Sequence, residues 1–171
     1  FQTTSRADEN RNGVGEYGTF GEMSGSIGVR GNAILNPPVL STAFRTVNAN
    51  GEVSRSGYLF AMYLPDGTGD GLAEVAGGGA DTNVDADLAE TTWCCYAWPV
   101  NFSQTGNRTF FVNQAGDIYQ YNNKGAANYS GSAGGPVGDE IFQVANDMGS
   151  PVCNVAGAVL GQDGENWVPV Q

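Results

Sequence analysis

Apolar residues concentrate in the middle of the chain, where their spacing predicts β-strands. Residues 46–65 place Asn50-Gly51, a dipeptide typical of tight hairpin turns, between two runs of β-forming residues. In residues 58–64 nearly every side chain is apolar, which predicts a central strand that is covered on both faces. Two further strand segments follow: a buried strand over residues 91–100, and a second hairpin over residues 108–123 that turns at Asn113–Gly116.

The segments around these strands contain few helical patterns. One helical turn is expected near Phe20–Met23. A second short helix is expected to end near Glu90, with Asp85 or Asp87 as its cap. We therefore expect less helix than in an average globular domain.

The remaining segments complete the predicted domain. Residues 1–7 are expected to form an N-terminal arm or the end of a helix, and residues 65–90 a long Gly/Asp-rich loop. Residues 150–160 and 165–170 are expected to form a last pair of strands. The whole chain, residues 1–171, is thus predicted to be one domain of the α+β class, mostly β: a single antiparallel sheet with long Gly/Asp-rich loops and little helix.

The charge balance narrows the possible partners. Lys and Arg total 7 residues against 18 Asp and Glu, so the formal net charge is -11. Nucleic acid and anionic membrane surfaces both require clustered cations, so neither is an expected partner. The chain has no histidine and a single lysine, Lys124, which lies in a Gly/Asn-rich segment. These features exclude Ser-His-Asp and Cys-His arrangements, and we expect a protein that is not an enzyme.

The segment "DENRNGVGE", residues 8–16, has oxygen-bearing side chains at alternate positions. Calcium prefers about 6–8 oxygen ligands, which a tight loop can supply from alternate positions, with glycine at its sharp bend. The match is partial, because the twelfth position is Thr19 and not the glutamate of an EF-hand. A turn rich in Asx residues without a metal is the alternative. The predicted calcium ligands are Asp8, Asn10, Asn12, the carbonyl group of Val14, and Glu16.

A second set of oxygen-bearing side chains lies in and around the 65–90 loop. Its sequence "DTNVDAD" again places oxygens at alternate positions, but helix capping is the favoured interpretation. The members of this set are Asp66, Asp70, Asp81, Asn83, Asp85, Asp87 and Glu90.

Three cysteines and three sequons bear on the cellular compartment. Neighbouring strand residues point to opposite faces, so Cys153 is predicted to form a disulfide with either Cys94 or Cys95; three buried free thiols are the alternative. The sequons, together with the acidity and the low lysine content, favour an exported protein that is found outside the cell or at the cell surface. The predicted glycosylation sites are Asn101, Asn107 and Asn128.

Aromatic residues are frequent in the predicted strands, where they are expected to form the core. A sugar-stacking platform or a subunit interface is the alternative use of these side chains. They are Trp93, Tyr96, Trp98, Phe102, Phe110, Phe111, Tyr119 and Tyr121.

Three segments together resemble the soluble domain of type IV pilin-like and pseudopilin-like proteins of the planctomycete type: "RADENRNGVGEYGTFGEMSG", "SGYLFAMYLPD" and "AETTWCCYAWPVNFSQTGNRTFFVNQAGDIYQ". Part of the third segment, "YAWPVNFSQTGNRTFFVNQAGDIYQ", is also similar to a small family of uncharacterised exported bacterial domains. Pilin-like proteins assemble into filaments through a long apolar N-terminal helix. No apolar run follows Phe1 here, so we expect a filament to use another device, such as a strand donated by residues 1–7 or by the tail "NWVPVQ".

The expected function is therefore that of a structural subunit of an extracellular, pilus-like filament that is glycosylated and stabilised by calcium. Identical subunits are the expected partners in a homopolymer, and glycans are a second partner class. The residues given are not expected to contact a membrane directly. The alternative is a monomeric binding module of the cell envelope that holds a glycan or another protein.

Overall fold

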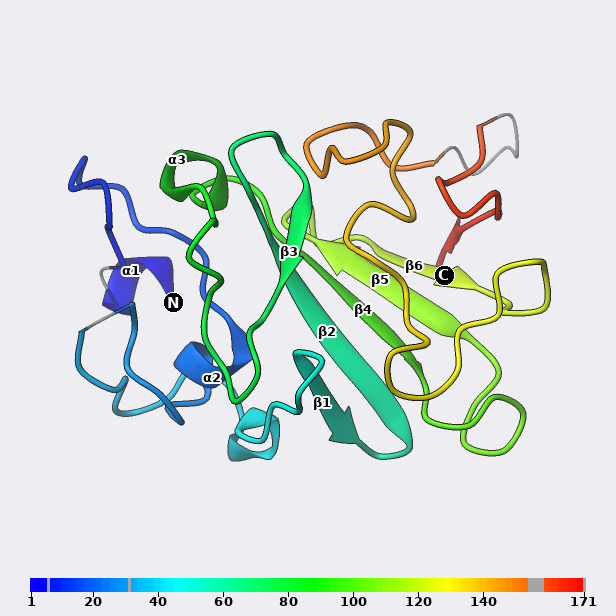
Figure 1. Cartoon of the computed structure of the whole chain (residues 1–171), viewed down its shortest axis with the longest axis horizontal. Helices are drawn as coiled ribbons and strands as arrows, with labels where there is room; N and C mark the ends of the chain where they lie inside the picture. The colour runs from blue at the N-terminus through cyan, green and yellow to red at the C-terminus, as the bar shows by residue number, and fades with distance from the viewer. Residues whose placement is uncertain (6, 31, 154–158, 171) are drawn as a thin grey trace.

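A single antiparallel sheet organises the protein, as the sequence predicts. The computed structural model describes residues 1–5, 7–30, 32–153 and 159–170. Its sheet has seven strands, of which six follow one another in the order β1-β2-β4-β5-β6-β7 and β3 pairs with β2 (Figure 1). Helix is confined to short pieces, so the α+β, mostly β fold class is confirmed. The strands are β1 (Glu52–Arg55), β2 (Tyr58–Pro65), β3 (Gly71–Ala73), β4 (Cys94–Pro99), β5 (Thr109–Asn113), β6 (Ile118–Tyr121) and β7 (Val168–Pro169).

The central strand β2 is covered on both faces, as its continuous apolar sequence predicts. Leu59, Ala61 and Tyr63 point into the larger core cluster, and Met62 points into the smaller one on the opposite face. The larger cluster is rich in aromatic rings and is closed by residues from the later part of the chain, including Trp167. Half of the predicted aromatic core is thereby confirmed, because Tyr96, Trp98, Phe111 and Tyr121 lie in this cluster, and the partly buried Tyr119 packs against it.

The two predicted hairpins form, but the first one turns at an additional place. Asn50-Gly51 does reverse the chain, and it joins Val47 and Val53 through one isolated bridge. The longer β1–β2 ladder turns at Ser56-Gly57, where both residues have positive φ values of 52° and 81°. This geometry suits a tight hairpin turn, and the sequence analysis did not identify it. The second hairpin turns where expected, since the Gly116 amide donates to the Asn113 carbonyl group at 3.0 Å.

Short helices occur at the predicted places. α1 spans Gln2–Ser5 and α2 spans Phe20–Met23; η1, a 3-10 turn over Thr42–Phe44, was not predicted. Within the predicted 65–90 loop, the structure forms β3 and α3 (Ala86–Ala89). Asp85 caps α3, because its Oδ1 accepts a hydrogen bond from the Leu88 amide at 2.9 Å. This long segment is therefore more ordered than a loop.

The C-terminal strands differ from the prediction. β7 pairs with β6, with Val168 opposite Gln120, and among the described residues of the range 150–160 none pairs with it. In the described part of that range, Val152 makes one isolated bridge to Phe142; residues 154–158 lie outside the described residues. The C-terminal segment pairs with β6 through β7 and packs into the core through Trp167, so it is not a free donor strand. Pro169, which has no amide hydrogen, lies in this edge strand, which weakens it as a template for another strand.

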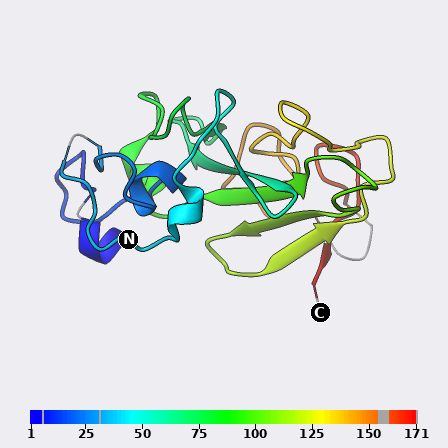
Figure 2. The ribbon, with the colours of Figure 1, turned by 90° about the horizontal axis from the view of Figure 1, so that it is seen from below.

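The two faces of the sheet are covered to different extents. Residues 124–153 and the C-terminal segment pack over one face and complete the larger cluster. On the opposite face, residues 20–47 cover the β1 and β2 side and form the smaller cluster with Phe20 and Phe44. Figure 2 shows β5 and β6 on the lower side of the molecule, with most other segments above them and the C-terminal end projecting below. This leaves the β4–β6 part of the second face open.

Candidate functional site

The oxygen-rich loop of residues 8–16 satisfies its own backbone. The carboxylate of Asp8 accepts hydrogen bonds from the amides of Asn12 at 3.0 Å and Gly13 at 3.1 Å. The side-chain oxygens of Asn10 and Asn12 accept from the amides of Asn12 and Val14 at 3.0 and 2.7 Å. The side-chain oxygens of Asp8, Asn10 and Asn12 therefore accept hydrogen bonds from the backbone of the turn. This is the arrangement expected of an Asx-rich turn without a metal.

The loop also brings the two predicted acidic sets together. Asn10 Nδ2 donates to Asp87 Oδ1 at 2.5 Å, and Asn12 Nδ2 donates to Glu90 Oε1 at 2.7 Å. These bonds join positions nearly 80 residues apart, and no local pattern predicts them. The side-chain amides of Asn10 and Asn12, and not a cation, are thus the hydrogen-bonding partners of the Asp87 and Glu90 carboxylates.

Glu16, the last predicted calcium ligand, is buried beneath the loop, where its carboxylate bridges the loop backbone and Arg30. Its side chain is fully buried and its Oε2 lies 2.7 Å from Nη1 of Arg30. Glu16 Oε1 also accepts from the Glu9 amide at 2.6 Å. The five predicted ligands are therefore not gathered around one point, and in this arrangement they do not fit a calcium ion. Among the described residues, no group of three or more Asp, Glu, His or Cys side chains is placed to hold a metal ion. Calcium binding stays a prediction.

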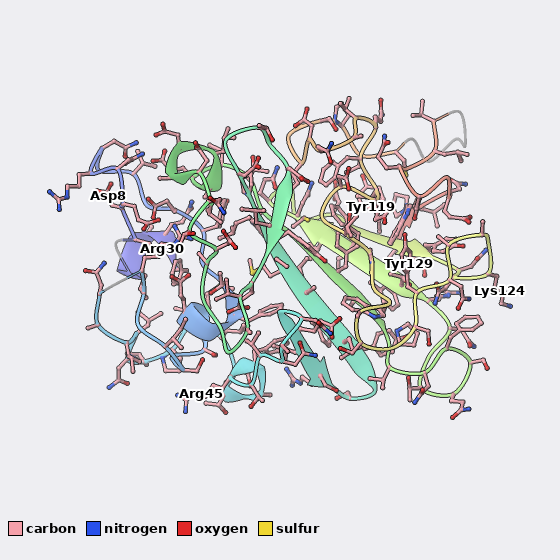
Figure 3. The ribbon with its side chains drawn as sticks, in the orientation of Figure 1. Asp8, Arg30, Arg45, Tyr119, Lys124 and Tyr129 are labelled. Atoms are coloured by element: carbon pink, nitrogen blue, oxygen red, sulfur yellow. The ribbon has the colours of Figure 1, made fainter. Side chains whose placement is uncertain are left out.

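Arg30 is the centre of a buried ionic cluster. Its guanidinium lies within 4.0 Å of three carboxylates, at 2.7 Å from Glu16, 3.6 Å from Glu22 and 4.0 Å from Glu9. Its side chain is 4% exposed, and Figure 3 shows it between α1 and α2, below the Asp8 loop. Burial raises the pKa of Glu16, while the Glu9 amide and the Arg30 charge lower it. The cluster fastens the N-terminal segments to one another.

Glu74 makes a second buried contact to the same region. It accepts hydrogen bonds from the amides of Phe20 and Gly21, at 3.1 and 2.7 Å, and from Gly79 at 2.9 Å. Burial raises the pKa of Glu74, and these amide donors lower it in part. Glu74 therefore attaches the 65–90 segment to α2. The burial of Arg30, Glu22 and Glu74 was not predicted, because no local sequence pattern marks these charged residues as buried.

The predicted covalent sites lie in different environments. Cys94, Cys95 and Cys153 are all free, so the disulfide predicted for Cys153 is absent from this structure. Cys94 and Cys153 are buried on the larger core face, where Cys153 Sγ contacts the Trp167 carbonyl oxygen at 3.8 Å. The sequon asparagines Asn101, Asn107 and Asn128 are exposed. Their modification stays a prediction.

The open part of the second sheet face forms an apolar groove. Strand register places Phe60, Ala97 and Phe110 side by side across three strands, and Cys95, Val112 and Ile118 in the next row. A groove of about 460 Å³ follows these rows. Ile118 is 50% exposed and Val170 is 44% exposed. The residues that line this groove, called the open face below, are Tyr58, Phe60, Cys95, Tyr96, Ala97, Phe110, Phe111, Val112, Ile118 and Val170.

The apolar character of the open face can be seen in the sequence of β5. Residues 109–112 are Thr-Phe-Phe-Val, so apolar side chains point to both faces of β5, as in the central strand. The same argument that predicted two covered faces for β2 predicts an apolar outer face for β5. In the structure β5 has its cover on one face only.

Comparisons with known proteins give a single match. A family model described as "Protein of unknown function (DUF2950)" matches residues 34–143, which contain β1 to β6 and most of the open face. No curated protein and no solved structure matches the chain. None of the helices in the described part of the chain has the length and apolar character needed to cross a membrane.

Proposed function

The chain belongs to the DUF2950 family, and we propose that it is a structural subunit that assembles with copies of itself into an extracellular, pilus-like filament. The observation that carries the proposal is the open face. An apolar sheet face of this kind stays exposed to water at a free-energy cost, which association with another apolar surface removes. The resemblance to pilin-like soluble domains supports the same function.

The composition of the open face favours a protein surface over a sugar as its partner. The residues that line it carry no charge, and their polar side-chain groups are confined to the hydroxyl groups of Tyr58 and Tyr96 and the thiol of Cys95. Tyr96 is fully buried, so its hydroxyl group does not reach a ligand in the groove. Glycan sites need several hydrogen-bonding groups beside their aromatic rings, whereas protein interfaces have an apolar centre.

Assembly through this face differs from strand donation. The tail forms β7 and buries Trp167, while Gln2 of the N-terminal arm donates its side-chain amide to the Glu90 carbonyl group at 2.8 Å. Both candidate donor segments thus have contacts within their own chain. The open face, in contrast, has no cover among the described residues and is available without rearrangement.

The test compares two isoleucines of similar exposure. Ile118 lies on the open face at 50% exposure, and Ile34 lies outside it at 56% exposure. Ile118→Asp should prevent association, because a carboxylate buried in an interface without a partner costs several kcal/mol, on the order of 2 or more. Ile34→Asp should leave association unchanged. Sedimentation velocity and negative-stain microscopy measure the outcome, with circular dichroism to confirm folding.

The wild-type protein at high concentration decides the proposal. Oligomers or filaments that Ile118→Asp abolishes would support it. A protein that stays monomeric at all concentrations, or oligomers that tolerate Ile118→Asp as well as Ile34→Asp, would refute it.

A monomeric binding module of the cell envelope is the second candidate. The observation in its favour is the pair of half-buried rings of Tyr58 and Phe110 on the open face, whose centroids are 6.0 Å apart. Saturable binding on a glycan array, lost in Phe110→Ala, would favour this candidate over the filament.

A further inference from the structure

Exposed cations gather at one end of the sheet. Antiparallel pairing sets Tyr58 opposite Pro99 and Thr109 opposite Tyr121, so the β1–β2 turn, the β4–β5 connection and the exit of β6 lie at the same end. Residues 54–58, 99–109 and 121–124 contain no Asp or Glu. They contain three exposed cationic residues: Arg55, Arg108 and Lys124. Figure 3 places Lys124 at the border of the molecule opposite Asp8. We call this the basic end.

Acidic side chains gather at the other end of the same strands. The β2–β3 turn, the β5–β6 turn and α3 meet there, because the Asp85 amide donates to the Pro65 carbonyl group at 2.9 Å. The acids of these segments are partly or fully exposed. They are Asp66, Asp70, Asp85, Asp87, Glu90 and Asp117, and we call this the acidic end.

The cations of the basic end form no ion pair within 4.0 Å in the described part of the chain, although the Glu165 carboxylate lies beside Gly125, next to Lys124. All ion pairs among the described residues belong to the buried Arg30. Arg108 donates to the neutral side chain of Gln120, and the Arg55 guanidinium lies 5.3 Å from the Phe44 ring centroid. Lys124 is exposed at the edge of its loop. In a chain of net charge -11, three unpaired cations at one end create a strong charge asymmetry along the strands.

We propose that the partner at the basic end is the acidic end of a second copy of this chain, so that subunits associate head to tail along the strand direction. This inference rests on the proposed filament function and deepens it. Opposite charges select the orientation of the encounter, while the adjoining open face supplies the apolar area. A head-to-tail contact joins two different surfaces, so it leaves one of each free and continues into an open fibre rather than closing as a dimer.

Charge complementarity also decides against the symmetric alternative. A two-fold dimer that pairs basic ends would place Arg55, Arg108 and Lys124 of each copy close to the same cations of the other. Pairing of acidic ends would place six carboxylates of each copy against six of the other. Both arrangements are repulsive, and the head-to-tail contact is attractive at both of its surfaces.

The test reverses the charges of each end separately in the full chain. One variant carries Arg55→Glu, Arg108→Glu and Lys124→Glu, and the other carries Asp70→Lys, Asp87→Lys, Glu90→Lys and Asp117→Lys, which gives the former acidic end a net positive charge. Each variant alone should associate about tenfold more weakly than the wild-type protein, because several exposed charge pairs become repulsive. Mixed in equal amounts, the two variants should associate again, since every contact then joins unlike charges. Arg11→Glu and Arg45→Glu, two exposed cations outside the basic end, serve as controls for the change in net charge.

Sedimentation velocity at low and at physiological salt separates the outcomes. Weak association of each variant, recovery on mixing and little effect of the controls would support the inference. If the variants associate as strongly as the wild-type protein, or no more weakly than the controls, or fail to recover on mixing, the head-to-tail contact is refuted. In that case wild-type assembly that remains sensitive to Ile118→Asp would leave the filament proposal standing. A wild-type protein that never associates would refute both.

Discussion

Replacement of Arg30 by methionine is the sharpest test of the buried ionic cluster. Arg30→Met keeps an unbranched apolar stem but removes the only cation within 4.0 Å of Glu16 and Glu22 among the described residues. The side chains of these two acids are 0% and 1% exposed, so neither can recover its hydration without unfolding. Breaking a buried ion pair from one side costs about 3–5 kcal/mol. Since domains of this size are stable by about 5–15 kcal/mol, the variant should lose a third or more of its free energy of unfolding.

The pH dependence gives this prediction a signature that simple loss of packing would not produce. Without Arg30, burial raises the pKa of Glu16 further, so the folded state binds a proton more readily than the unfolded state. Stability then increases as the pH falls through the range between the unfolded and the folded pKa. The difference between wild-type protein and Arg30→Met should therefore be largest at pH 7 and above, and it should shrink towards pH 5. Adding Glu16→Gln to the variant should recover part of the loss at pH 7.

Urea unfolding followed by tryptophan fluorescence measures these differences, because Trp98 and Trp167 are buried in the core. Arg11→Met, at an exposed position, is the matched control and should change the free energy of unfolding by less than about 0.5 kcal/mol. A loss below about 1 kcal/mol for Arg30→Met, or a loss that is the same at pH 5 and pH 7, would show that the cluster is not a buried network in solution.

Three further predictions test other parts of the structure. Burial and a neighbouring carboxylate raise the pKa of Glu140 to about 7, so its ionisation destabilises the fold as the pH rises from 4.5 to 7. After a discount for partial solvent exposure, Glu140→Gln should be more stable than the wild-type protein by about 1 kcal/mol at pH 8 and equal to it below pH 4, as measured by urea unfolding; no gain at pH 8 would contradict this. A Cβ atom at Gly135 would lie 2.2 Å from the Trp98 ring, so Gly135→Ala should cost about 1–3 kcal/mol while Gly67→Ala, which meets only a side-chain oxygen at 3.5 Å, should be nearly neutral in thermal unfolding. If calcium binds the residue 8–16 loop, millimolar calcium should raise the melting temperature and Asp8→Ala should remove the increase; an unchanged melting temperature would end the calcium prediction.

The elements of the fold that could be predicted are those whose structure is indicated by their own local sequence. The all-apolar run of residues 58–64 predicts a central strand, and the Asp85 cap predicts α3, because both signals are local. A strand within residues 165–170 forms as predicted, but its place next to β6 was not predicted, because it depends on tertiary packing such as the burial of Trp167. Strand pairing over long separations depends on tertiary packing that a local pattern does not contain.

The candidate site shows the same division. The alternation of oxygens in residues 8–16 predicted a tight turn or a cation loop, and the turn forms with each acceptor in use. The contacts of Asn10 with Asp87 and of Glu16 with Arg30 could not be predicted, because an acidic residue next to a turn is usually solvated. Burial of Glu16 depends on where α2 and the following segment pack.

The adjacent cysteines of β4 supply a pair of internal reporters. Cys94 belongs to the larger core, whereas Cys95 lines the groove on the other side of the sheet. Alkylation of Cys94 therefore requires the whole domain to open, while alkylation of Cys95 requires only that its side of the sheet be uncovered. Peptide mass spectrometry of the two labelled thiols would follow unfolding and surface coverage within the same molecule, without a foreign probe.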